Sequence, residues 1–317
     1  MTETVIEKTA EGSQKSVYGR RAEIIYSLKL LVSNKLVLAG LVIVVVTTVL
    51  ALISGYLVNP RQYLVLNPHW NYCWDNPLIN WNTPNPTPCQ PSTYHPLGTD
   101  NYGRDLWQMM ILGLPIDLQL SFEIVFTAVI IGVVLGSVAA YAGGVIDEAI
   151  LRVTDIFFAF PALVLALVIL TIFRPPSLTD LVIATLIIWW PLYVRLTRSQ
   201  ILAEKEKSYV EALRSVGAGR LRILFLHIVP NSIYPVIVQA TLDIGGVILT
   251  ISALMFLGFT PNPYLPELGQ LTSYGIAAVF SAPWLAFFPG MMIVVVALGW
   301  NLLGDGVRDV LDPRLRR

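Results

Sequence analysis

The sequence predicts an all-α integral membrane protein with six transmembrane helices. Of its 317 residues, 55% are hydrophobic and only 13% are charged, and the mean hydropathy is +0.65. Soluble globular domains carry about a quarter charged residues. Several apolar stretches are long enough to cross the roughly 30 Å hydrocarbon core of a bilayer. The apolar composition makes the lipid bilayer the expected partner, and the net charge of zero indicates neither nucleic acid nor an acidic partner.

The first predicted span covers residues 36–58, which contain no charged side chain. The other five spans are predicted at about residues 118–141, 156–173, 179–194, 233–256 and 284–303. Pro161 predicts a kink in the third span. Gly132, Gly136 and Ala140 recur at four-residue spacing in the second span, which lets helices approach closely. Spans two to six form a predicted core of residues 117–303.

The positions of Lys and Arg predict the orientation, because cytoplasmic loops carry an excess of these residues. Most of the 21 fall in the tail 1–35, in the loop after the fourth span and in the tail 304–317. Both termini and this loop are therefore expected in the cytoplasm, in a multi-pass protein of the cell membrane. The long loop 59–116 is then extracytoplasmic.

The outer loop contains the two cysteines of the chain, Cys73 and Cys89. Disulfides persist in oxidising compartments, and a bridge closing about 15 residues contributes roughly 3 kcal/mol in the loop-entropy model. We expect a Cys73–Cys89 disulfide, with two free thiols as the alternative. His95 and Asp100 are interpreted as residues that structure the loop, since nothing nearby completes a metal site.

The loop between the fourth and fifth spans, residues 203–231, includes the segment YVEALRSVGAGRLRILFLHIVPN. Val210, Leu213 and Val216 form an apolar stripe at helical spacing. Gly217 and Gly219 predict a break, because glycine accepts a left-handed turn. A second apolar run then ends at proline. Two short helices joined at a glycine elbow should form a knob that docks on a partner.

This segment resembles the EAA loop of ABC-importer permeases. The likeness rests on Glu211 and Ala212, on Gly217, and on residues 227–231, which read HIVPN. In such permeases the loop inserts into a groove of the ATPase subunit. The resemblance implies a polar contact through Glu211, an elbow at Gly217 and a docking surface that includes Arg220 and Leu221. The alternative is an amphipathic loop without a special role.

The wider chain resembles the dipeptide/oligopeptide/nickel family of ABC-importer permeases, and specifically its C-type subunit. The matching segments are HPLGTD at 95–100, GRD at 103–105, DE at 147–148, AFP at 159–161, APW at 282–284, FPG at 288–290 and NLLGDG at 301–306. The resemblance implies half of a translocation pathway for short peptides, with oligosaccharides or nickel as alternative substrates. It also implies a homologous second permease, two ATP-binding-cassette ATPases and an extracytoplasmic solute-binding protein as partners.

The sequence contains no set of residues typical of an enzyme active site. It lacks the GxxxxGK[ST] pattern that holds nucleotide phosphates. We therefore expect no enzymatic activity, no metal and no bound cofactor, with ATP–Mg used by the partner ATPase. The competing class is a secondary transporter or a structural membrane subunit, which would place charge pairs along several spans.

Asp243 is a rare ionisable residue near the middle of a predicted span. Such groups usually face a cavity or pair with a partner, because a charge is costly in hydrocarbon. One hypothesis is that Asp243 lines the translocation path and meets the substrate. The alternative is a structural hydrogen bond to a neighbouring helix.

Overall fold

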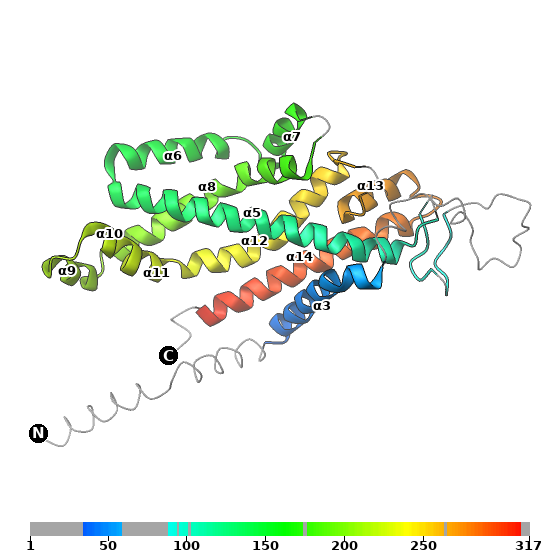
Figure 1. The fold of residues 1–317 in the computed structure, drawn as a ribbon, viewed down its shortest axis with the longest axis horizontal. Helices are drawn as coiled ribbons and strands as arrows, with labels where there is room; N and C mark the ends of the chain where they lie inside the picture. The colour runs from blue at the N-terminus through cyan, green and yellow to red at the C-terminus, as the bar shows by residue number, and fades with distance from the viewer. Residues whose placement is uncertain are drawn as a thin grey trace, which may run out of the picture.

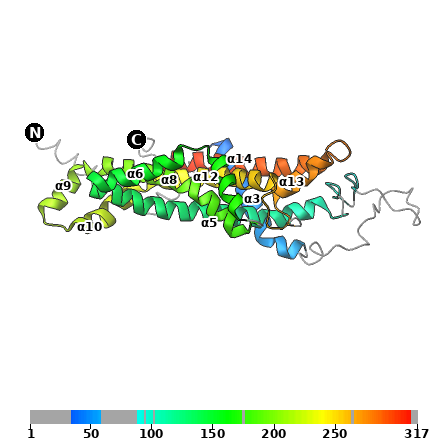
Figure 2. The same cartoon turned by 90° about the horizontal axis from the view of Figure 1, so that it is seen from above.

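The structure is a computed structural model that describes residues 34–58, 88–93, 95–100, 103–173, 176–262 and 265–311. Within these ranges the secondary structure is helical, apart from one isolated β-bridge between Thr99 and Asp105. The long helices lie side by side in an elongated bundle (Figure 1). Seen from above, the same body has α9 and α10 at one end and α13 toward the other (Figure 2). The all-helical membrane fold predicted from the sequence is confirmed.

Five helices of the described chain are long and apolar enough to span a membrane. They are α3 (Lys35–Leu57), α5 (Leu106–Ala142), α8 (Leu178–Lys205), α12 (Tyr234–Phe256) and α14 (Trp284–Leu311). The fifth predicted span differs from α12 by one residue at its start. The fourth and sixth were predicted too short, because α8 and α14 continue past the apolar core into charged segments. Residues 203–205 of the predicted coupling loop therefore belong to α8.

The third predicted span is a broken pair of helices. Helix α6 (Gly144–Phe158) and α7 (Ala162–Ile172) meet at a bend of 87°, and the described chain has a sixth candidate span if this bent pair is taken as one. Pro161 lies at the break, as expected from its missing N–H donor. The prediction of one span over 156–173 was wrong in its start, because α6 begins at Gly144, directly after α5.

The second span begins much earlier than predicted. Asp105 caps α5 by accepting a hydrogen bond of 3.0 Å from the backbone N–H of Gln108, so residues 106–116 are helical and not part of the outer loop. Pro115 is accommodated inside the helix. At 1.5 Å per residue the 37 residues of α5 extend about 55 Å, well beyond the thickness of a bilayer core.

The small residues of α5 bring it close to α8, as predicted. A methyl group added at Gly132 would lie 2.1 Å from the Cβ of Tyr193. One added at Gly136 would lie 2.7 Å from the backbone oxygen of Val194. Only glycine fits at these two contacts, so the helix backbones themselves are in contact.

Ion pairs fasten α6 to α8. Both guanidinium nitrogens of Arg198 that face α6 bond to the carboxylate of Asp147, at 2.5 and 2.6 Å. Further along, Arg195 pairs with Asp155 through one nitrogen, donates from Nε to the hydroxyl of Thr154 at 3.2 Å and lies over the ring of Phe158. These bidentate and stacked contacts are geometries that arginine provides and lysine does not.

Four shorter helical segments lie between α8 and α12, namely α9 (Ser208–Ser215), α10 (Arg220–Ile223), the π-helix η2 (Leu224–Ile228) and α11 (Val229–Ser232). Helix α13 (Leu268–Ala277) follows α12 and packs on α12 and α14. The start of α3, the end of α14 and the segment α9–α11 lie toward one end of the bundle, and α13 lies toward the other (Figure 1).

Candidate functional site

The candidate site is the knob formed by residues 208–232, which comprises α9, α10, η2 and α11. It projects beyond the ends of α5 and α8 (Figure 1). The predicted helix–elbow–helix pattern is present, with α9 ending at Ser215 and the second helical run beginning at Arg220.

Gly217 forms the elbow. Its φ is +79°, in the left-handed region that favours glycine, and its N–H donates to the carbonyl of Arg214. Gly219 is different, because its φ of −62° and ψ of 144° are accessible to any residue. The prediction of a glycine-dependent break therefore holds for Gly217 alone.

The inner side of the knob packs on the bundle. A buried apolar cluster joins knob residues to the last turns of α5 and α8. Its members are Ala140, Ile201, Val210, Ile223, Leu224 and Ile228. This cluster therefore packs the knob directly against the ends of α5 and α8.

Polar contacts at the end of α8 reinforce this attachment. The ammonium group of Lys205 donates to the carbonyl of Ala140 at 2.8 Å, and the hydroxyl of Tyr209 donates to Glu204 at 3.0 Å. Burial raises the pKa of Tyr209 above its usual range, so the hydroxyl remains a donor at neutral pH. Glu204 also pairs with Lys207 at 2.6 Å. The knob is therefore anchored to helix ends.

The outer side of the knob is apolar and exposed. Val216, Leu221 and Leu226 are 79%, 69% and 63% exposed, and Phe225 is also exposed. Of the predicted apolar stripe, Val210 is buried, whereas Val216 lies after the end of α9 and is exposed. Leu221 points outward, whereas Ile223 and Leu224 pack back on the permease.

Charged side chains are exposed on the same knob. Glu211 and Ala212 are exposed on α9, and Arg220 begins α10. The carboxylate of Glu211 makes no hydrogen bond or ion pair within the described residues, although the backbone oxygen of Glu211 accepts from Ser215. Exposed apolar and charged side chains occur together at protein interfaces.

The second run of the knob contains a π-helical turn, which the sequence pattern did not reveal. Pro230 follows η2 and lacks an N–H, so the regular hydrogen-bond ladder cannot continue through it. Asn231 donates from its side chain to the carbonyl of His227 at 2.8 Å. Single π turns of this kind are frequent at functional sites.

The elbow gives a matched pair of test substitutions. We expect Gly217→Ala to destabilise the knob by about 1–2 kcal/mol, because a side chain is strained in the left-handed region. Gly219→Ala should be neutral, since the added methyl meets nothing within 4 Å and the backbone is extended. Limited proteolysis of the knob should be accelerated about five- to thirtyfold in Gly217→Ala only. Equal rates of proteolysis in Gly217→Ala and Gly219→Ala would contradict the assignment of Gly217 as the elbow.

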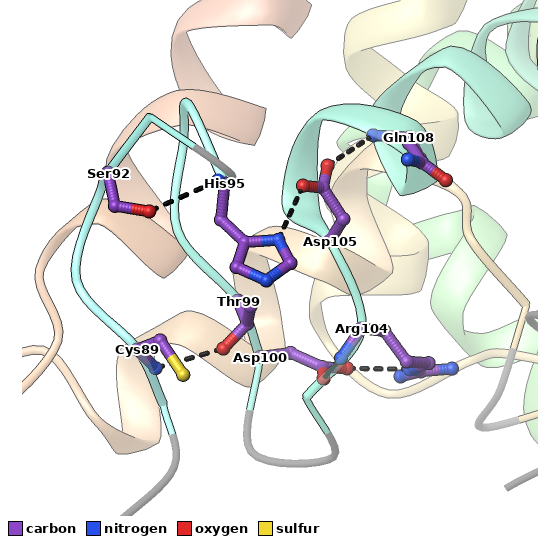
Figure 3. Close-up of polar contacts among 8 residues, drawn as sticks. All are labelled: Cys89, Ser92, His95, Thr99, Asp100, Arg104, Asp105 and Gln108. Carbon is purple, nitrogen blue, oxygen red and sulfur yellow. Dashed lines mark hydrogen bonds and ion pairs between the residues drawn. The ribbon is translucent and has the colours of Figure 1, made fainter. Parts of the chain in front are cut away.

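At the other end of the molecule, the segment before α5 forms a compact polar turn (Figure 3). A ring nitrogen of His95 lies 2.9 Å from Asp105, and Arg104 donates to Asp100 at 2.7 Å. The hydroxyl of Thr99 accepts from the backbone of Cys89 at 2.9 Å. His95 and Asp100 bond to residues of their own loop, in keeping with the loop-structuring interpretation.

Cys89 is buried and is not a free thiol. Its predicted partner, Cys73, lies outside the described residues, so the Cys73–Cys89 pairing stays a prediction.

Asp243 is buried between α8 and α12. Its carboxylate accepts one hydrogen bond from the hydroxyl of Tyr193 at 2.7 Å and another from the side-chain amide of Gln239 at 2.9 Å. Only 8% of Asp243 is exposed. This geometry favours the structural alternative over a contact with substrate, because both carboxylate oxygens already have donors.

The bundle of spans with a helical knob defines the chain as a membrane component of a transport system. Residues 132–317 match the family described as binding-protein-dependent transport system inner membrane component, and the chain belongs to this family. It is a multi-pass inner-membrane protein.

Three individual relatives show which permeases the chain is similar to. The chain is 39% identical to the dipeptide transport system permease protein of Alkalihalophilus pseudofirmus, over 91% of this chain and 89% of that one. It is 36% identical to the dipeptide permease of Haemophilus influenzae, over 90% and 92%. It is 34% identical to the oligopeptide transport system permease protein of Bacillus subtilis, over 90% and 88%. The importer class predicted from the EAA-like segment is confirmed.

Proposed function

We propose that this chain forms half of the translocation pathway of an ATP-driven importer of short peptides. Support for the substrate class comes from the relatives above, whose names specify dipeptides and oligopeptides and which match along nearly their whole length. The second half of the pathway is a homologous permease, and a solute-binding protein delivers the peptide from outside.

The knob couples this chain to an ATPase that binds and hydrolyses ATP–Mg. The observation that carries this part is the set of exposed apolar residues of the knob, which includes Leu221 and stands in contrast to the knob residues buried against α5 and α8. Glu211, Ala212 and Arg220 border it, and Gly217 fixes its shape. Two ATPase subunits serve the two permease halves.

Closure of the ATPases would then displace the knob as a rigid piece. Because the buried cluster fixes the knob to Ala140 of α5 and Ile201 of α8, these helices tilt with it. Helix α8 in turn carries α6 through the pair of Arg198 with Asp147. A movement at one end of the bundle therefore changes the opening at the other.

The proposed orientation places the knob and both termini in the cytoplasm. It is supported by the excess of Lys and Arg in those segments, and by the position of the start of α3 and the end of α14 toward the knob end of the bundle (Figure 1).

The test is uptake of a labelled dipeptide by proteoliposomes that contain the complete importer. Uptake should require ATP and the binding protein, and unlabelled di- and tripeptides should compete with it. Oligosaccharides and nickel should not compete. Transport of an oligosaccharide or of nickel in place of peptide would overturn the substrate assignment while leaving the coupling assignment to be tested separately.

A further inference from the structure

Two carboxyl groups are buried against each other where α5, α12 and α13 meet. Asp117 lies in α5 and is 2% exposed, and Glu267 is the N-cap of α13 and is fully buried. The two side chains interact directly, and no other ionisable group among the described residues acts on either of them. Neither the knob nor the polar turn before α5 involves this pair.

The pair has more acceptors than donors. Glu267 accepts from the hydroxyl of Ser252 at 3.2 Å and from the backbone N–H of Gln270 at 2.7 Å. Within the described residues, neither carboxylate oxygen of Asp117 has a hydrogen-bond partner of regular geometry, although the backbone N–H of Leu268 acts on this carboxylate, and the side-chain oxygen of Gln270 has no partner. A buried acceptor without a donor costs free energy. The site therefore lacks one hydrogen-bond donor.

Backbone packing prevents the two carboxyl groups from separating. A methyl group at Gly113 of α5 would lie 2.2 Å from the carbonyl oxygen of Pro266, next to Glu267. One at Gly269 would lie 2.2 Å from the carbonyl oxygen of Ser252 in α12. The start of α13 therefore packs closely against the backbones of α5 and α12. This close packing keeps the two carboxyl groups away from solvent.

Two ionised carboxylates cannot remain in such a site. Like charges in contact disfavour each other, and burial disfavours each charge separately. Burial raises the pKa of Glu267 above its usual range, although the Ser252 and Gln270 donors oppose this effect.

We propose that Asp117 and Glu267 bind one proton between them, and that the resulting O–H···O hydrogen bond ties the start of α13 to α5. The proton supplies the donor that the acceptor set lacks and removes one of the two buried charges. Helix α13 also lines a pocket with Asp100 and Arg104 through its residue Tyr274. The bound proton therefore holds in place the helix that forms this outer pocket.

Proton binding of this kind makes stability depend on pH. The folded chain keeps the proton at a pH where the carboxyl groups of the unfolded chain have released theirs. The folding equilibrium constant should therefore fall about tenfold for each pH unit above about 5, until the folded pair itself ionises. Asp117→Asn replaces the proton with amide donors and should remove this dependence.

The test uses the chain purified in detergent with the subunits that accompany it. Samples are heated at several pH values between 5 and 8 and then treated with protease, and the surviving band of this chain gives the unfolding midpoint. The unfolding midpoint of Asp117→Asn minus that of wild type should increase progressively as the pH rises. Glu123→Gln is the matched control, because Glu123 is an exposed carboxyl on the same helix, and its midpoint should follow wild type.

Infrared difference spectra at pH 7 provide a direct second measurement. A carbonyl-stretch band of a protonated carboxyl should appear in wild type minus Asp117→Asn, and also in wild type minus Glu267→Gln if the first variant fails to fold. No such band, or a midpoint that responds to added sodium or calcium and not to pH, would overturn the proposal. Neither measurement involves transport, so the result is independent of the proposed function.

Discussion

Substitution of Leu221 by Asp is expected to abolish ATP-driven uptake while the permease itself stays folded. Leu221 is exposed on the knob, so the folded chain alone tolerates a charge there. A carboxylate placed in the centre of a docked interface would lose its hydration without gaining a partner. Central interface residues contribute 2 kcal/mol or more, so ATPase binding should weaken at least about thirtyfold. Co-purification of the ATPase with the permease measures this loss.

Two variants separate docking from folding. Leu221→Met keeps an apolar side chain of similar size and should retain both ATPase and uptake. Leu224→Asp introduces a charge into the buried cluster beside Ala140, so it should lower the yield of folded chain. If Leu221→Asp retained its ATPase and its uptake, the apolar side of the knob would have no part in coupling.

The largest expected effect inside the membrane is at Asp243. Asp243→Leu leaves the buried hydroxyl of Tyr193 without its acceptor, at a cost of about 1–3 kcal/mol, and also removes the acceptor of the half-buried amide of Gln239. The α8–α12 contact should loosen, and the midpoint of thermal unfolding of the purified importer should fall. Asp243→Asn keeps an acceptor oxygen and a polar side chain of the same size, so stability and peptide uptake should both stay close to wild type.

The same variants distinguish the two hypotheses for Asp243. If its charge bound the substrate, Asp243→Asn would reduce uptake tenfold or more with unchanged stability. A double-mutant cycle with Tyr193→Phe adds a second criterion, since residues in direct contact couple by about 0.5–3 kcal/mol. Additive effects of Tyr193→Phe and Asp243→Leu would contradict the hydrogen bond between them.

The sequence predicted the span positions well where apolar residues were continuous and less well where other forces set the helix ends. Helix α3 starts one residue from its predicted start, since its apolar run is uninterrupted. Helix α5 starts at Leu106 because Asp105 caps it, yet Pro115 suggested a loop there. Helices α8 and α14 extend into charged residues, which continue a helix without contributing to hydropathy.

Some features of the candidate site could likewise be predicted from the sequence, and others could not. Short-range patterns predicted Gly217 and the helices on either side of it, because a left-handed glycine is a local property. They could not determine which apolar residues of the knob face outward, since that depends on the ends of α5 and α8. Asp117 and Glu267 are far apart in the chain, and only the folded backbone brings them into contact.

The most direct measurement of the central claim is site-specific photo-crosslinking from position 221. A photoreactive side chain at Leu221 should crosslink this chain to the ATPase subunit in membranes that contain the whole importer. The same group at Phe280, a fully exposed residue just after α13, should give no ATPase product. A crosslink from Leu221 to the solute-binding protein, or an ATPase crosslink from Phe280 alone, would contradict both the coupling role of the knob and the proposed orientation.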